Sequence, residues 1–282
     1  MLTNDNILQI RNLTKKYGNF EALKNINLSF ENGVYGLLGH NGAGKTTLLN
    51  CISGILDYDG EITYNGKDIH DKDLRFKEIL GVVPQQQTLD LPITVENFLY
   101  YISSLKGLKN YKGKIKQLLI ELELEEHKNK KLASISGGMK QRLLIAQCLL
   151  NDPKIVLLDE PTAGLDPVQR RNLRDILAVI SKDRIVILAT HVINDIELIA
   201  NNVVFMKSGN VLNFDTQDNL LSEIKVYETS QDIDDLISKD STIKVVNTKN
   251  VNGALWTRFI SEKDYPNRVH TSMDDVYLEW LG

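Results

Sequence analysis

GVYGLLGHNGAGKTT, from Gly33 to Thr47, joins a short apolar run to a glycine-rich loop and then to the start of a helix. The apolar run is typical of a strand buried on both faces. Gly39–Thr47 fits the pattern G-x-x-x-x-G-K-[ST], in which glycines let backbone N–H groups close around phosphate. The pattern predicts that Lys45 reaches the β- and γ-phosphates and that the Thr46 hydroxyl binds Mg²⁺. A plain glycine-rich turn is the alternative, and the strand–loop–helix order argues against it.

Two further apolar runs, KIVLLDE (154–160) and RIVILAT (184–190), also predict buried strands of a parallel sheet. Helices are expected between the strands, at 45–55, 167–181 and 192–201. The earlier runs ILQIRNL and LKNINLSF alternate, and GEITYNGKDI contains Asn65-Gly66, a hairpin turn signal. The sequence therefore predicts an α/β core with an antiparallel β layer from the N-terminal part.

The strand signals disappear between Thr94 and Leu150, where three segments read as helices, including one over 112–130. This pattern predicts a helical subdomain, at about 86–150, inserted into a first domain of residues 1–221. From about Glu223 the chain reads β-α-β-β and closes with a helix, MDDVYLEWLG. We expect residues 222–282 to be a small accessory domain without a catalytic motif.

Composition excludes several classes of protein. A formal charge of −4 and a pI near 5.8 argue against a nucleic-acid-binding surface as the main function. No apolar stretch approaches the roughly 20 residues of a membrane helix, and the start lacks the features of a signal peptide, so a cytosolic location is expected. Cys51 and Cys148 are expected to be buried hydrophobes, with Cys51 on one helical face with Leu48, Ile52 and Ile55.

Three polar residues follow the buried strands. Asp159 stands at the carboxyl end of its strand, where α/β sheets bind ligands, and is expected to hold Mg²⁺. Glu160 is placed to orient or deprotonate an attacking water. His191 follows the next strand and could hydrogen-bond a γ-phosphate, although a lone histidine is more often structural. His40, inside the glycine-rich loop, is expected to contribute only its backbone.

A second anion site is indicated by SISGGMKQR, Ser134 to Arg142, which precedes the apolar helical run LLIAQCLL. Ser136, Gly137 and Gly138 stand at the head of this helix, where N–H groups and the helix dipole favour an anion. A glycine-rich helix cap is the structural alternative.

Together these segments resemble the ATP-binding subunits of ABC transporters, over Ile7 to about Leu221. Six motifs occur in that family's order: YG at Tyr17–Gly18, the phosphate loop, VVPQ ending at Gln85, SISGGM, the LLDEP strand end and AGLD ending at Asp166. Ile135 and Met139 depart from the commonest signature residues, but leave the serine and glycines intact.

The resemblance implies a RecA-like P-loop NTPase core, ATP hydrolysis, and the cofactors ATP and Mg²⁺. It implies that Tyr17 stacks on adenine, that Gln85 serves metal and catalysis, and that two subunits pair head to tail. ATP would be held by the phosphate loop, whose residues are Gly39, His40, Asn41, Gly42, Ala43, Gly44, Lys45, Thr46 and Thr47. Ser136, Gly137, Gly138 and Asp166 would contact the ATP of the second subunit, in a homo- or heterodimer.

The phosphate-loop region, LLDEPTAGLDP and the separate C-terminal segment look most like the ATPase subunits of ABC-2-type exporters of peptides, antibiotics or lipid-linked compounds. Such a subunit would work on the inner face of the cell membrane through a separate permease. An importer ATPase remains an alternative, as does an ABC-type ATPase acting on nucleic acid or the ribosome. One cassette, no long heptad tract and an acidic pI argue against the last, so no nucleic-acid partner is expected.

The resemblance also implies a docking groove for the permease beside Gln85. On the helix beginning near Thr94, a 3.6-residue period predicts a core face made of Val95, Phe98, Leu99, Ile102 and Leu105. Tyr100 and Tyr101 are expected to point elsewhere. Tyr101, with Gln86 and Leu91, is the predicted lining of the groove, and a surface rim is the alternative.

Overall fold

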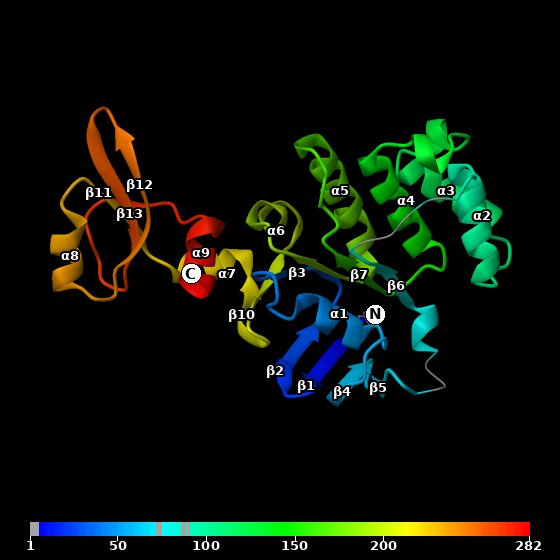
Figure 1. Ribbon diagram of the computed structural model, residues 1–282, viewed down its shortest axis with the longest axis horizontal. Coiled ribbons are helices and arrows are strands. Elements are labelled where there is room, and N and C mark those ends of the chain that lie inside the picture. The colour runs from blue at the N-terminus through cyan, green and yellow to red at the C-terminus, as the bar shows by residue number, and fades with distance from the viewer. Residues whose placement is uncertain (1–5, 72–74, 86–88, 90) are drawn as a thin grey trace, which may run out of the picture.

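The protein, described by a computed structural model over residues 6–71, 75–85, 89 and 91–282, is built around a six-stranded sheet (Figure 1). Its strand order is β10-β9-β3-β8-β7-β6, and only the edge strand β10 is antiparallel to its neighbour. The strands are β3 (Gly33–Leu38), β6 (Leu80–Val83), β7 (Ile155–Asp159), β8 (Ile185–Thr190), β9 (Asn202–Lys207) and β10 (Asn210–Thr216). The predicted α/β P-loop fold is confirmed.

The inner strands need an uninterrupted apolar sequence because both of their faces are buried. Every residue of β7 and β8 is buried, as expected for strands with both faces covered. β6 is a strand that the sequence analysis missed. It has four residues, LGVV, and so short an apolar run carries little periodicity of its own.

The antiparallel layer from the N-terminal part is also present. Its strand order is β2-β1-β4-β5, and the predicted hairpin at Asn65-Gly66 joins β4 to β5 with Tyr64 opposite Lys67. The bounds are β1 (Leu8–Tyr17), β2 (Phe20–Phe30), β4 (Asp59–Tyr64) and β5 (Lys67–Asp68). Its apolar face and α1 (Lys45–Ile52) share one buried cluster with one side of the central sheet.

The helical subdomain contains α2 (Val95–Leu105), α3 (Lys112–Glu121) and α4 (Gly137–Leu149). Short 3-10 turns lie at Glu125–His127 and Leu132–Ser134, and one more at Phe76–Glu78 precedes β6. The helix expected over 112–130 ends early because Glu123 adopts a left-handed backbone with φ 54°, which breaks the helical path.

Three details of the predicted helix faces are wrong. Ile55 does not share the face of Cys51, because α1 ends at Ile52, and Ile55 is 68% exposed. Leu105 is 66% exposed because it ends α2, beyond the packed part of the helix. Tyr100 packs half-buried against the core and against the Tyr111 ring, at a centroid distance of 6.0 Å, instead of pointing away.

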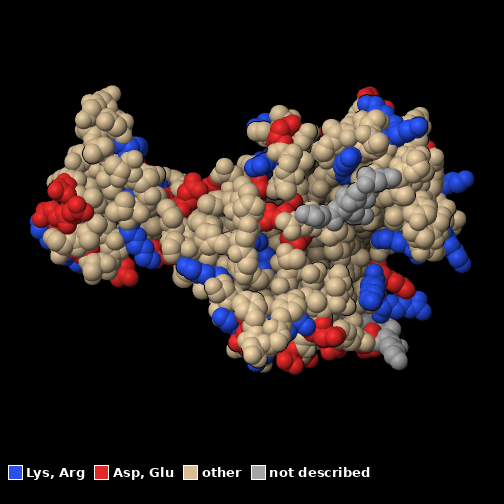
Figure 2. Space-filling view, viewed as in Figure 1, with Lys and Arg blue, Asp and Glu red and all other residues tan. Residues whose placement is uncertain are grey.

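The rest of the core consists of α5 (Pro167–Ile180), a 3-10 turn at Ser181–Asp183, α6 (Ile193–Ile199) and α7 (Gln217–Glu223). The accessory segment follows, with a sheet ordered β12-β13-β11-β14 that carries α8. Its elements are β11 (Val226–Thr229), α8 (Ile233–Lys239), β12 (Lys244–Val251), β13 (Ala254–Ile260), β14 (Arg268–Val269) and α9 (Met273–Leu281). In Figure 2 this sheet forms a separate lobe, joined to the main body by a narrower region.

The last helix, α9, lies between that lobe and the main body (Figure 1). It contacts β12 of the lobe and packs against α6, α7 and β9 of the main body. Its apolar side chains Met273, Val276 and Leu281 belong to the same buried cluster as the central sheet. The accessory segment is therefore anchored to the core by its own final helix.

Both cysteines are buried and unpaired, as predicted. Burial raises the pKa of Cys51 to about 11 and that of Cys148 to about 12, which makes them unreactive thiols. Within the residues described, no helix has the length and apolar character needed to cross a membrane.

Candidate functional site

The phosphate loop, Gly39–Thr47, leaves the carboxyl end of β3 and runs into the first turn of α1. Gly44 stands at the N-cap with φ 107°, a conformation that side chains rarely adopt, and a Cβ there would lie 3.0 Å from the Ala22 carbonyl. The loop's N–H groups and the N-terminus of α1 therefore form a concave, electropositive surface suited to phosphate.

Lys45 is buried, and its ammonium lies inside the loop. Its Nζ donates to the carbonyls of Gly39 (2.6 Å) and His40 (3.1 Å). Burial lowers the pKa of Lys45, and the charges of Glu160 and Asp159 oppose that change. Within the described part of the chain its hydrogen-bond partners are neutral carbonyls, so this buried cation is well placed to turn to an anionic ligand.

A cavity of about 410 Å³ opens over the loop. Tyr17, from the end of β1, lines one side and is 48% exposed, as the stacking prediction requires. Phe20, 66% exposed at the start of β2, lines the same cavity, and the sequence analysis missed it. The available signal was a second aromatic residue three positions after Tyr17, across the Gly18–Asn19 turn, where the two residues pair. The loop contributes Asn41, Gly42, Ala43, Gly44, Lys45, Thr46 and Thr47 to the lining, together with Ala22, Gln85 and Glu160.

Asp159 meets Thr46 at the floor of the loop. The Thr46 hydroxyl donates to Asp159 Oδ2 at 2.8 Å, across 113 residues of sequence. Asp159 Oδ1 is buried and has no hydrogen-bond partner among the described residues. Burial raises the pKa of the Asp159 carboxyl, while the Thr46 hydrogen bond and Lys45 lower it again. A hydroxyl beside a carboxylate whose second oxygen is buried and unsatisfied fits a hard cation such as Mg²⁺.

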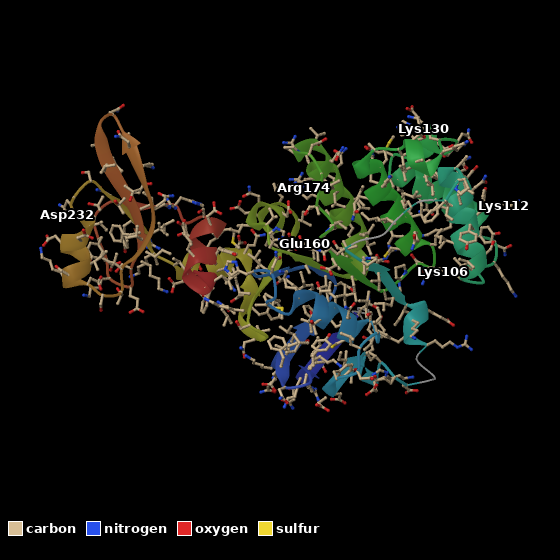
Figure 3. The ribbon with its side chains drawn as sticks, viewed as in Figure 1. Lys106, Lys112, Lys130, Glu160, Arg174 and Asp232 are labelled. Carbon is tan, nitrogen blue, oxygen red and sulfur yellow. The ribbon has the colours of Figure 1, made fainter. Side chains whose placement is uncertain are left out.

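Glu160 is buried and held from two sides at the centre of the main body, where Figure 3 labels it. Its Oε1 lies 2.8 Å from His191 Nδ1, and its Oε2 accepts the Thr190 hydroxyl at 3.2 Å. The sequence placed His191 near a γ-phosphate, and the structure shows it directly against Glu160. Thr190, fully buried at the end of β8, was missed because a threonine closing an apolar run carries no motif.

The backbone of Glu160 has a left-handed conformation with φ 49°. Such a conformation costs a non-glycine residue about 1–3 kcal/mol and persists only where the surroundings impose it. The Glu160 N–H donates to the Ala189 carbonyl at 2.8 Å, which fixes this turn onto the neighbouring strand. The carboxylate is thereby directed back over the strand ends and toward the phosphate loop.

Gln85 follows β6 and is exposed. It lines both the loop cavity and an adjoining cavity of about 400 Å³ that also contains Thr46 and Asp159. Its position between the two agrees with a residue that could approach a metal at Thr46. Gln86 lies outside the described residues.

The signature segment, Ser134–Met139, is not brought to this cavity. The Ser136 hydroxyl caps α4 by accepting from the Met139 N–H at 3.3 Å, so the structural alternative accounts for this serine. Gly138 packs so closely on α5 that a Cβ would lie 2.6 Å from Gln169, whereas Gly137 faces open space. Asp166 caps α5, and accepts from the Gln169 N–H at 2.9 Å.

The side chain of His40 makes a structural contact that the sequence analysis did not identify. Its ring stacks edge-on against Tyr277 of α9, with centroids 5.5 Å apart, and the Tyr277 hydroxyl lies 3.1 Å from His40 Nδ1. No sequence pattern joins residues 237 positions apart.

Known proteins are similar to this chain in sequence and in fold. The profile of the ABC transporter family matches residues 23–163. The uncharacterized ABC transporter ATP-binding protein YxlF of Bacillus subtilis is 38% identical over 209 residues, covering 73% of this chain and 69% of that protein. Human phospholipid-transporting ATPase ABCA3 is 34% identical over 210 residues, covering 72% of this chain. The match spans only 12% of ABCA3, and only 25% of ABC transporter A family member 8 of Dictyostelium discoideum.

Among solved structures, cbiO1 from Clostridium perfringens, described as part of the ABC transporter complex cbiONQ, aligns with a TM-score of 0.70 and 31% identity. The alignment covers 78% of this chain and 92% of cbiO1. An ATP-binding subunit of an ABC transporter aligns at 0.68 and 26% identity, over 77% of this chain and 92% of that subunit. With half of its length matched by the family profile, the chain belongs to the ATP-binding, ATP-hydrolysing proteins of the ABC transporter family.

Proposed function

We propose that the chain is the ATPase subunit of an exporter and drives a separate membrane subunit by pairing head to tail with a second ATPase subunit. The pairing is supported by one observation: the residues predicted to bind ATP lie in two separate places on a single chain. The loop cavity contains Lys45 and Glu160 from one chain, while Ser136 and Gly137 lie on a surface outside it. A second copy, or a related chain, would supply those groups to the exposed side of the bound nucleotide.

Mg²⁺ would be held by the Thr46 hydroxyl and Asp159, with Gln85 approaching from the adjoining cavity. These protein ligands are few, and within the described residues no cluster of three or more His, Cys, Asp or Glu could hold a metal. The remaining ligands would be phosphate oxygens and water, as is usual for magnesium at a nucleotide. When bound, Mg²⁺ neutralises charge on the phosphates.

Hydrolysis would depend on Glu160. Its carboxylate orients the attacking water and accepts its proton, with Thr190 and His191 fixing the two carboxylate oxygens. His191 uses Nδ1 toward Glu160 in the structure, and its Nε2 would need a second proton on the ring to donate to a γ-phosphate oxygen. Lys45 would leave its carbonyl partners and donate to the β- and γ-phosphates.

The pairing is tested by sizing chromatography with MgATP. Glu160→Gln should keep ATP binding but stall hydrolysis, so that trapped ATP holds two subunits together. Adding Ser136→Arg to this variant should remove most of the dimer, because the arginine would fill the space that the partner's phosphate needs. A monomer with Glu160→Gln alone would contradict the pairing.

Export is supported by the similarity to ABCA3, which is named as a phospholipid-transporting ATPase, and by the separate C-terminal segment. We propose that the cargo is a peptide, an antibiotic or a lipid-linked compound, and that the subunit works at the inner face of the cell membrane through its permease. Copurification tests the class of partner. An integral membrane protein would support the proposal, and ribosomes or DNA would support the soluble alternative. Cargo leaving loaded vesicles would separate an exporter from an importer.

A further inference from the structure

The C-terminal helix α9 contacts the phosphate loop in addition to the core. Tyr277 and the Leu281 carbonyl reach the His40 ring, while the Lys207 ammonium of β9 donates to the same Leu281 carbonyl at 3.2 Å. These contacts connect the end of the accessory segment to the second residue of the loop.

Both nitrogens of the His40 ring contact α9. The Tyr277 hydroxyl lies 3.1 Å from Nδ1 and 3.3 Å from Nε2, and the Leu281 carbonyl lies 3.4 Å from Nε2. Because that carbonyl can only accept, the ring with its proton on Nε2 donates to it and leaves Nδ1 to accept from the Tyr277 hydroxyl. The perpendicular ring contact adds a preferred aromatic geometry.

The peptide of His40 in turn shapes the loop. Its carbonyl accepts from the Ala43 N–H at 3.1 Å, which closes the turn of the loop, and from Lys45 Nζ at 3.1 Å. A restraint on the His40 side chain therefore also restrains the peptide that orients the loop's turn and its lysine. Loops that are ordered before binding lose less conformational entropy when the ligand arrives.

We propose that Tyr277 is a positioning residue for ATP binding, through which α9 holds the phosphate loop in its binding conformation. The inference rests on the proposed assignment of Gly39–Thr47 as the ATP site. It gives the accessory segment a direct effect on nucleotide affinity in its own subunit, exerted through one tyrosine–histidine contact.

A double-mutant cycle on the full chain tests the proposal, with the dissociation constant of MgATP and the melting temperature measured for each variant. Tyr277→Phe keeps the aromatic ring but removes the hydroxyl, and should weaken MgATP binding about 3- to 10-fold, the effect of one hydrogen bond. In a His40→Ala background the same substitution should change affinity less than twofold, because the imidazole that the Tyr277 hydroxyl contacts is absent. Glu279→Gln, which removes an ion pair to Lys244 elsewhere on α9, is the matched control and should leave affinity unchanged.

Equal losses of affinity from Tyr277→Phe in both backgrounds would overturn the proposal, since they would indicate a general effect of α9. Unchanged or tighter binding in Tyr277→Phe alone would also overturn it. Lys45→Ala separates this test from that of the ATP site. If the wild type binds MgATP and Lys45→Ala does not, the site stands whatever the cycle shows.

Discussion

Glu160 combines a left-handed backbone with a carboxylate whose two oxygens are engaged by His191 and Thr190. Removing one of these partners should leave the phosphate-loop contacts to ATP intact and disturb the orientation of the base. We expect His191→Ala to reduce turnover at saturating ATP by no more than the roughly 10²- to 10⁴-fold that general acid–base catalysis supplies, with a smaller change in ATP affinity. Steady-state kinetics and equilibrium binding check this, with Thr190→Ser, which keeps the hydroxyl, as control. Lost affinity with normal turnover would contradict the role of His191.

Lys45 offers the simplest test at the residue scale. Its buried ammonium bonds to two loop carbonyls and has no carboxylate within bonding distance among the described residues. Lys45→Ala should abolish MgATP binding or nearly so, because the β- and γ-phosphates lose their cation. Calorimetry measures the affinity, and circular dichroism checks the fold. Undiminished affinity would show that the site is assigned wrongly.

At the scale of an element, α9 depends on a buried ion pair. Ser272 is the N-cap residue of α9, and Asp275 completes the capping box by accepting from the Ser272 N–H at 2.7 Å. Asp275 also accepts from Arg258 at 2.8 and 2.6 Å. Burial would raise the pKa of Asp275, but the hydrogen bonds from Arg258 and Ser272 outweigh it and hold the pKa below its ordinary value. The stabilisation is thus present above the unfolded-state pKa near 3.9 and is lost as pH falls through the lower folded-state pKa.

Asp275→Asn should therefore lower the free energy of unfolding by about 2–3 kcal/mol at pH 7. Arg258 would lose its closest carboxylate and keep the longer ion pair to Glu228 at 3.6 Å. Below pH 4 the difference from the wild type should shrink. Denaturant unfolding at several pH values measures both. Asp274→Asn, on the exposed side of α9, is the control and should change stability little. A pH-independent difference would contradict the ion-pair explanation.

The exposed surface formed by α2 and the segment before it is the predicted docking groove for the permease. Tyr101 is 49% exposed and Leu91 is 41% exposed, so both are available to a coupling segment of the permease. Tyr101→Ala should leave ATP binding by the isolated subunit intact and weaken assembly with the membrane subunit, as judged by copurification. Ile120→Ala, an exposed apolar residue on α3, is the control. Normal assembly and transport after replacing both Tyr101 and Leu91 would exclude this groove.

At the scale of the whole molecule, the accessory lobe is attached at both ends. The chain enters it after α7 and returns through α9 to the core. Truncation after Ser222 should leave a folded subunit that still binds MgATP, with a lower melting temperature because the apolar faces of α6 and β9 lose their cover. Affinity should fall several-fold, in line with the loss of Tyr277. Complete loss of binding in a soluble, folded truncation would make the segment part of the ATP site itself.

The sequence by itself determined the phosphate loop, the buried strands that flank it and the acidic strand end at Asp159. These features depend on neighbours along the chain: glycines in one loop, and apolar runs whose length and continuity encode burial. The shorter β6 and the turn at Glu123 escaped detection, because four apolar residues or one left-handed backbone carry no periodic signal.

Only the tertiary structure decided which distant residues meet. The approach of Thr46 to Asp159, of Thr190 and His191 to Glu160, and of Tyr277 to His40 depends on the order in which parallel strands pair and on where α9 packs. The capping role of Ser136 likewise required coordinates, since a serine before two glycines suits both a helix cap and an anion site. A hydrogen bond across 237 residues leaves no pattern in a single sequence, because it does not dictate which residue types stand next to either partner in the chain.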